Sequence, residues 1–185
     1  MFASVDFSGL PDPGYKEDAV REDIVAPILR AVGFSATGPN RMIRSKPLSH
    51  PYVNIGSTRK KLSIIPDYLL EVDGSVVLAL DAKAPGESVI KSKHVEQAFS
   101  YAIHPEVRVN TYGLCNGSEI ALYDINRFEP VLHTDITDPK NWDALAKFLA
   151  PRTLLQPKLR DYCPDLGMQL RRSGADADFN AVSFR

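Results

Sequence analysis

The sequence predicts a mixed α/β domain in which helices flank a central β-sheet. Three observations support this fold class. A helical apolar pattern begins after residue 14, and two pairs of strand-like segments follow, joined at Asp73-Gly74 and Asn116-Gly117. An amphipathic segment with helical spacing separates the two pairs. This order of elements favours one sheet covered by helices over an all-helical or all-β domain.

The first predicted helix spans Tyr15–Val32, and Gly33 supplies a natural stop. Proline lacks a backbone N–H and its ring clashes with the preceding turn. Pro27 should therefore kink this helix or mark a break in it. The apolar residues that recur at helical spacing are Val20, Ile24, Ile28 and Ala31.

The strands are predicted from apolar runs that end at turn residues, because Asp-Gly and Asn-Gly favour tight hairpins. They are Ile64–Val72, Ser75–Lys83, Val107–Cys115 and Glu119–Asp124, and a fifth short strand could run over Val131–His133.

Two further helices are predicted from amphipathic spacing. Lys91–Ile103 places Val95, Ala98, Phe99 and Ala102 on one side. Trp142–Leu149 is a short helix, for which Asn141 or Asp138 is a plausible N-cap.

The remaining segments lack clear periodicity. Residues 1–14 are rich in proline, glycine and aspartate and are expected to form an irregular lead-in. Residues 34–62 form a mixed segment that could hold a short strand around 52–55. The folded domain should therefore span residues 15–150, and residues 151–185 should be an extension that could be partly disordered.

Composition is ordinary for a globular protein, with 44% hydrophobic and 24% charged residues and a net charge of -1. No apolar run approaches the roughly 18 residues that a membrane helix requires. The N-terminus also lacks the pattern of a signal peptide. Cys115 and Cys163 lack zinc-binding spacing and are too few for a disulfide framework, which favours buried free thiols. We therefore expect a cytoplasmic protein with no membrane association.

A local basic segment lies inside this nearly neutral chain, because no acidic residue occurs between Arg41 and Ile65. Such segments are more often solvated loops than binding sites, but a phosphate-contacting role is an alternative. Two lysines that follow the second strand raise the same choice. The candidate DNA-contacting residues are Arg44, Arg59, Lys60, Lys61, Lys91 and Lys93.

Three charged residues of the predicted hairpin could form a metal-dependent catalytic site. An apolar run leads directly into Asp81, and Lys83 lies two residues further, so a strand directs both side chains to the same face. Asp67 lies on the other predicted strand, Ile64–Val72. Two carboxylates on neighbouring strands suit a hard cation such as Mg²⁺, for which the backbone carbonyl of Ala82 is a further candidate ligand.

The turn geometry decides whether Asp67 can join this site. A two-residue loop at Asp73-Gly74 alone would pair Asp67 with Leu80 and leave Asp81 on the opposite face. We therefore predict a three-residue loop starting at Val72, which would pair Asp67 with Ala79, or an equivalent bulge. The competing interpretation is that Asp81 and Lys83 form an ordinary ion pair worth under about 1 kcal/mol.

The motif resembles that of a known nuclease family. Pro66-Asp67 followed by the run 80–86 (LDAKAPG) is similar to the motif of the N-terminal domain of type I restriction enzyme R subunits and their stand-alone relatives. That domain belongs to the PD-(D/E)XK superfamily, which implies a restriction-endonuclease-like fold. The similarity covers roughly residues 15–125. It includes the first helix with Glu17 and Arg21, a Gln-x-x-x-Tyr element at Gln97–Tyr101, and the hairpin at Tyr112–Asp124.

The resemblance implies DNA cleavage that depends on Mg²⁺, for which Mn²⁺ could substitute. It implies that Asp67 and Asp81 bind the metal and that Lys83 positions or activates water. Glu17 matches the acid that often completes the site, and Gln97 and Tyr101 match residues that assist catalysis or contact DNA. Asp81 stands where Glu is common, and both are admitted by the motif.

We therefore expect a Mg²⁺-dependent deoxyribonuclease linked to restriction or defence, acting with or without other subunits. The sequence contains no Walker A glycine loop, so we expect no ATP site in this chain. One alternative is a catalytically silent nuclease fold that binds DNA or partner subunits. Another is an unrelated α/β domain in which the hairpin ion pairs are structural.

Overall fold

The computed structural model describes residues 2, 5–50, 54–55, 58–59 and 62–155, and for residues 50, 54–55, 58–59 and 62 it describes the backbone only. The chain divides into two units, Met1–Leu155 and Gln156–Arg185, and the described residues all lie in the first. Cys163 and the segment 156–185 therefore fall outside the described residues, as do Tyr52 and Val53.

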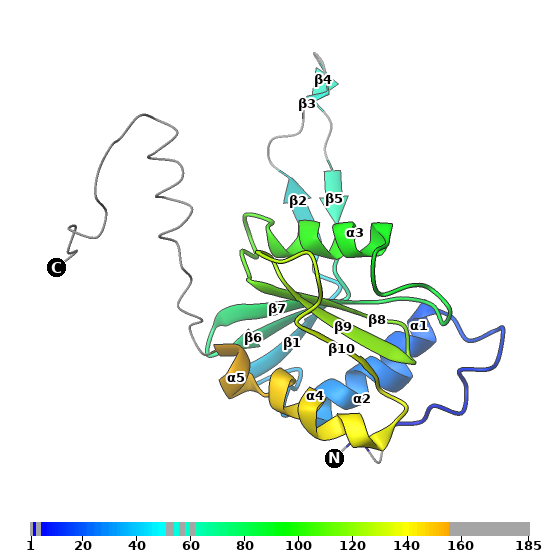
Figure 1. The fold of residues 1–185 in the computed structure, drawn as a ribbon. Coiled ribbons are helices and arrows are strands. Elements are labelled where there is room, and N and C mark those ends of the chain that lie inside the picture. Colours follow the sequence, from blue (N-terminus) through cyan, green and yellow to red (C-terminus); the bar gives the residue numbers. More distant parts are fainter. Residues whose placement is uncertain (1, 3–4, 51–53, 56–57, 60–61, 156–185) are drawn as a thin grey trace, which may run out of the picture. The chain divides into compact units, whose positions relative to one another are not determined.

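A six-stranded sheet with the order β1-β6-β7-β8-β9-β10 forms the centre of this unit (Figure 1). Strands β7 and β8 run parallel because a helix connects them, whereas every other neighbouring pair is antiparallel. The predicted mixed α/β architecture is therefore confirmed. The strands are β1 (Asn40–Arg44), β6 (Tyr68–Val72), β7 (Ser75–Ala82), β8 (Thr111–Cys115), β9 (Glu119–Asp124) and β10 (Leu132–Asp135).

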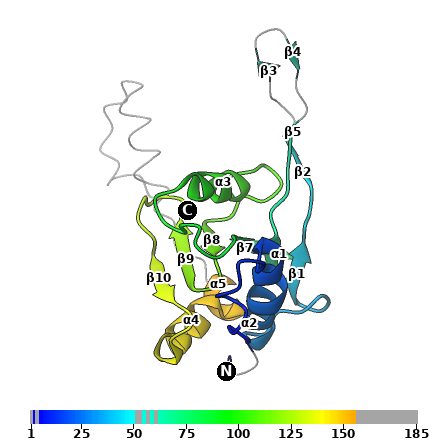
Figure 2. The same cartoon turned by 90° about the vertical axis from the view of Figure 1, so that its right-hand side faces the viewer.

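Helices lie on both faces of the sheet (Figure 2). Along β7, Leu78 and Leu80 pack into the hydrophobic core shared with the first helical segment and the C-terminal helices, whereas Ala79 packs into a second core shared with α3. Because both faces are covered, β7 is an almost continuous apolar run. The helices are α1 (Glu17–Ala19), η1 (Val20–Val25), α2 (Ala26–Ala31), α3 (Lys93–Ala102), η2 (Pro139–Asn141), α4 (Trp142–Leu149) and α5 (Pro151–Leu155).

The first helical segment changes type where the sequence predicted an irregularity. It contains a π-helical stretch, η1, immediately before the α-helix that holds Pro27. The N–H of Ala26 donates to the carbonyl of Arg21, five residues back. The wider π-helical turn is compatible with Pro27, which has no backbone N–H to donate to the preceding turn. The segment ends at Ala31, and Gly33 adopts a φ of 103°.

The segment between the first helix and the hairpin holds more strand than predicted. It contains β1 and two short antiparallel pairs, β2 (Leu48–His50) with β5 (Leu62–Ile64), and β3 (Asn54–Ile55) with β4 (Thr58–Arg59). The prediction that one strand runs through Ile64–Val72 is wrong, because residues 65–67 separate β5 from β6. Asp67 lies in this break.

Among the described helices, none is long and apolar enough to cross a membrane.

Candidate active site

The β6–β7 hairpin places Asp67 opposite Asp81 by means of a β-bulge. Its turn is a two-residue loop, Asp73-Gly74, with φ of 48° and 81°, as a type I′ turn requires. Val72 pairs with Ser75, yet further along Leu70 pairs with Leu78, which leaves Val77 unpaired. The extra residue on β7 shifts the register by one. The predicted three-residue loop is therefore wrong, and the alternative prediction, a bulge, is confirmed.

Two hydrogen bonds hold the two aspartates together across the strand ends. The backbone N–H of Asp67 donates to Oδ1 of Asp81 at 3.2 Å, and Oδ2 of Asp67 accepts from the N–H of Ala82 at 2.8 Å. The backbone carbonyl of Asp67 also accepts from the N–H of Ser45, which ties the break before β6 to the segment after β1. Both carboxylates are buried, at 9% and 3% exposure, so their geometry is set by the fold.

Lys83 completes the group at the end of β7. Its ammonium lies 2.6 Å from Oδ2 of Asp81 and 3.5 Å from Oε1 of Glu17. Lys83 is 5% exposed. Its backbone N–H donates to the backbone carbonyl of Cys115 on β8. A buried pair of this kind is not the exposed ion pair considered as the alternative interpretation, because breaking it would leave an uncompensated buried charge.

The charges of this group perturb one another. Burial raises the pKa of Asp81 to about 6, and the neighbouring Asp67 carboxylate adds to this effect, whereas Lys83 opposes it. Burial alone would lower the pKa of Lys83, but the Asp81 carboxylate, with Glu17 and Asp67, outweighs it and raises the pKa above its ordinary value. At neutral pH the Asp81–Lys83 pair is therefore charged on both sides.

Helix α3 brings Gln97 and Tyr101 to the same region. The two residues are one turn apart, and the Gln97 amide donates to the Tyr101 hydroxyl oxygen at 2.6 Å. Burial raises the pKa of Tyr101, and the nearby carboxylates of Asp81, Asp67 and Glu17 raise it further. Tyr101 thus stays a protonated phenol facing an acidic environment, where its O–H can donate.

The sequence did not predict a second cluster behind Asp67. Arg21, on η1, lies 3.4 Å from Oδ1 of Asp67, and the carbonyl of Arg21 accepts from the Tyr68 hydroxyl at 2.8 Å. The Arg44 guanidinium pairs with Glu22 and stands 5.6 Å from the centre of the Tyr68 ring. The apolar stripe of the first helix gave no signal for these contacts, because Arg21 and Glu22 lie beside it.

The predicted DNA-contacting residues do not share one location in the described part of the chain. Arg44 is engaged by Glu22, and its position next to the Asp67 cluster was not anticipated. Lys91 and Lys93 are exposed before and at the start of α3. Lys60 and Lys61 lie outside the described residues, and of Arg59 only the backbone is described.

The donor set fits a divalent cation that is shared with a substrate. Mg²⁺ is commonly held by one or two protein carboxylates, with water and substrate phosphates completing its octahedron. Asp67 and Asp81 supply such a pair from adjacent strands. Among the residues described with side chains, no group of three or more His, Cys, Asp or Glu could hold a metal ion, and Glu17 lies against Lys83 instead.

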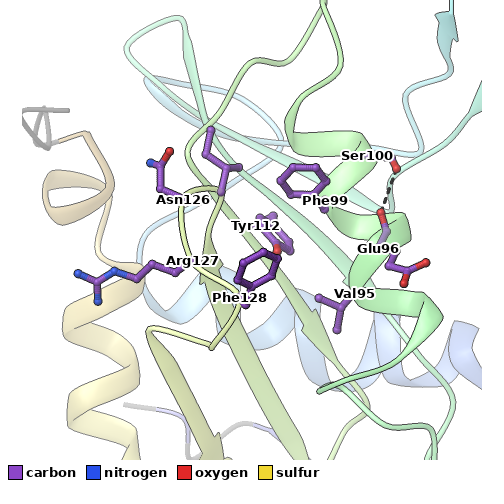
Figure 3. Close-up of a pocket in the computed structure, with 9 residues that line it drawn as sticks. Val95, Glu96, Phe99, Ser100, Tyr112, Asn126, Arg127 and Phe128 are labelled. Carbon is purple, nitrogen blue, oxygen red and sulfur yellow. Dashed lines mark hydrogen bonds between the residues drawn. The ribbon is translucent and has the colours of Figure 1, made fainter. Parts of the chain in front are cut away.

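A cavity lies away from this site, against another face of α3 (Figure 3). It has a volume of about 480 Å³, and its lining is mostly apolar. None of Asp67, Asp81 and Lys83 reaches it, so we place the candidate reaction site at the end of β7 and not in this cavity. The lining residues are Val95, Glu96, Phe99, Ser100, Tyr112, Ile125, Asn126, Arg127 and Phe128.

No family model and no curated protein matches the chain. Among solved structures, it is similar to a chain of the DrdV–DNA complex determined by cryo-EM, with a TM-score of 0.54 and 13% sequence identity. The similarity covers 92% of this chain and 16% of that chain, so this chain spans about a sixth of its length. The fold is therefore restriction-endonuclease-like: a six-stranded mixed sheet flanked by helices.

Proposed function

We propose that this chain is a Mg²⁺-dependent nuclease of the PD-(D/E)XK type that hydrolyses DNA phosphodiester bonds. The observation that carries the proposal is the convergence of two buried carboxylates, Asp67 and Asp81, with the buried ammonium of Lys83 at the end of β7. Two buried carboxylates and an ammonium are costly to hold together, which favours a catalytic purpose over a purely structural one.

The family resemblance and the fold add context to this proposal. We infer relatedness to the N-terminal domain of type I restriction enzyme R subunits, and a role in restriction or defence that could involve other subunits. The structural neighbour was solved as a complex with DNA, which supports DNA as the substrate. Affinity for DNA should come mostly from phosphate contacts and should fall steeply as salt is raised.

Phosphodiester hydrolysis needs an activated water and relief of negative charge on the phosphate. A bound Mg²⁺ lowers the pKa of its water and polarises the phosphate. Asp67 and Asp81, with the carbonyl of Ala82 as a further candidate ligand, would hold that ion at the strand ends. The raised pKa of Lys83 keeps it protonated, so Lys83 donates a hydrogen bond to the attacking water or to the developing charge, and does not act as a base.

The surrounding residues have supporting roles in this proposal. Glu17 holds the Lys83 ammonium from the first helix and is the candidate acid for a second ion. Tyr101 remains protonated, and because Gln97 occupies its oxygen as a donor, the phenol O–H is directed to an acceptor. A phosphate oxygen near Asp81 is the acceptor we propose.

Asp81→Asn should abolish cleavage, because it removes a metal-binding charge without changing the size of the side chain. We expect a loss of about 10³-fold or more, equivalent to about 4 kcal/mol of transition-state stabilisation. The assay follows cleavage of supercoiled plasmid, single-stranded DNA and RNA with Mg²⁺, Mn²⁺ or EDTA. Asp73→Asn is the matched control, because Asp73 lies in the exposed turn of the same hairpin with a φ of 48° that asparagine tolerates.

Equal cleavage by wild type and Asp81→Asn would remove the proposed site. If the wild type cleaves nothing with either cation yet binds DNA in a salt-dependent manner, the nuclease proposal fails. The alternative, a catalytically silent nuclease fold that binds DNA or partner subunits, then replaces it. Circular dichroism of the variants checks that the fold survives.

A further inference from the structure

Arg21 lies among three carboxylates of different exposure. Its guanidinium is 3.1 Å from Asp18, 3.2 Å from Glu22 and 3.4 Å from Asp67. The Asp18 side chain is 84% exposed, whereas that of Asp67 is 12% exposed. Arg21 itself is 27% exposed, so it connects the rim of the site with one of the two buried aspartates.

The backbone at Arg21 is fixed by contacts with Tyr68 and, through Glu22, with Arg44. The Tyr68 hydroxyl donates to the Arg21 carbonyl at 2.8 Å, and Glu22 is paired with Arg44 of β1. Arg21 and Glu22 belong to the π-helical stretch η1, and such stretches occur frequently at functional sites. These contacts fix the backbone from which the Arg21 side chain extends to the carboxylates.

The four carboxylate oxygens of the site differ in what occupies them. Peptide N–H groups donate to Oδ2 of Asp67 and Oδ1 of Asp81, and these bonds belong to the strand geometry. Cationic side chains occupy the other two, with Arg21 at Oδ1 of Asp67 and Lys83 at Oδ2 of Asp81. A divalent cation that binds Asp67 through Oδ1 therefore meets the Arg21 guanidinium at the same atom.

We propose that Arg21 is an internal counter-ion that competes with the metal for Asp67. It holds the carboxylate in the metal-free site and yields Oδ1 when the cation binds, while Asp18 and Glu22 retain the guanidinium at the rim. The released N–H groups of Arg21 then contact a phosphate oxygen of the substrate. This inference rests on the proposed metal-dependent nuclease, and it makes Arg21 a positioning residue in the free protein and a substrate contact in the complex.

Arg21→Gln separates this role from a structural one. Loss of a competing counter-ion should tighten metal binding, whereas loss of a structural support for Asp67 should weaken it. Calorimetric titration of the DNA-free protein with Mn²⁺ or Mg²⁺ should show binding tightened by about tenfold, since a competing positive charge is gone. The turnover number on plasmid DNA at saturating metal should fall by roughly 10- to 100-fold, since a phosphate contact is lost. Arg21→Lys should retain the competing charge, so its metal affinity should lie closer to that of the wild type than the affinity of Arg21→Gln does.

Arg41→Gln is the matched control, because Arg41 pairs with Glu71 across β1 and β6 and contacts no residue of the site. It should leave both metal affinity and turnover unchanged. If Arg21→Gln weakens metal binding or leaves it unchanged while the wild type cleaves DNA, the counter-ion role is overturned and the nuclease stands. If the wild type binds metal but cleaves nothing, the nuclease fails, and tighter binding by Arg21→Gln would still support the competition.

Discussion

The two central hairpins of the sheet both turn at a glycine, Gly74 and Gly117, but differ in register. In β8–β9, the register is constant from the pair Thr111–Asp124 to the pair Cys115–Ile120. In β6–β7, the register shifts at Val77. The β8–β9 hairpin is regular and its strands serve the core, whereas the interrupted β6–β7 hairpin leads to the carboxylates.

This difference shows what a single extra residue does in a sheet. Side chains alternate between faces along a strand, so a regular two-residue hairpin would put Asp67 and Asp81 on opposite faces. The bulge at Val77 restores the shared face near the end of β7, where the apolar core gives way to the charged group. Local disruption of the ladder is the structural basis of the candidate site.

The most direct test of this comparison is to delete Val77. The hairpin would then be regular, yet Asp67 would stay opposite Asp81, because the register from Val72–Ser75 would continue unbroken to Tyr68–Leu80. If the bulge serves only to align the strand ends, cleavage should stay within about tenfold of the wild type. Circular dichroism and thermal unfolding report whether the sheet survives the deletion, and a plasmid assay reports activity.

A second variant tests whether the extra residue must lie in the strand. Inserting one glycine after Gly74 in the Val77 deletion restores the thirteen residues between Asp67 and Asp81, now through a three-residue loop without a bulge. We expect this variant also to cleave, because Asp67 stays opposite Asp81. Folded protein without activity in either variant would show that the bulge has a role beyond register.

The pH dependence of metal binding is a second way to sharpen the comparison. Among the described strands of the sheet, only those of the β6–β7 hairpin end in a buried acid with a raised pKa. Burial raises the pKa of Asp81 to about 6, and metal binding needs its ionised form. The apparent affinity for Mg²⁺ should therefore weaken by about tenfold per pH unit below 6. Calorimetric titration between pH 5 and pH 7.5, with roughly half-unit steps, measures this slope.

Stability should respond to pH in the opposite sense. The folded pKa of Asp81 lies above its ordinary value of 3.8, so the folded state binds more protons than the unfolded state in this window. The contribution of Asp81 to the free energy of unfolding is fully present below 3.8 and is lost as pH rises through about 6. Asp81→Asn should remove this dependence in urea titrations, and an unchanged profile would contradict the assignment.

The smallest effect is expected in the regular hairpin. A Cβ at Gly113 would lie 2.5 Å from the Leu122 side chain and 3.0 Å from both the Ala121 carbonyl oxygen and the Leu80 side chain. Overpacking of this kind costs about 1–3 kcal/mol. Gly113→Ala should lower the free energy of unfolding by that amount and change the turnover number at room temperature by less than about twofold. A large loss of turnover with little loss of stability would show that β8 shapes the site.

Local patterns determined much of the architecture. Glu119–Asp124 and Trp142–Leu149 have the bounds that their apolar spacing predicted, and α3 begins and ends within the predicted segment. Strand β1 escaped prediction because only Met42 of its five residues is buried, and the strand is formed by pairing with β6, including the Arg41–Glu71 ion pair. An edge strand of this composition carries no alternating apolar signal.

The candidate site divides in the same way. The sequence by itself determined that Asp81 and Lys83 share a face, because two residues on one strand have a fixed period, and it limited the hairpin to an odd loop or a bulge. Only the tertiary structure decided that a bulge at Val77 supplies the register and that Arg21 reaches Asp67. Both depend on contacts between segments distant in the chain, and no local period encodes such contacts.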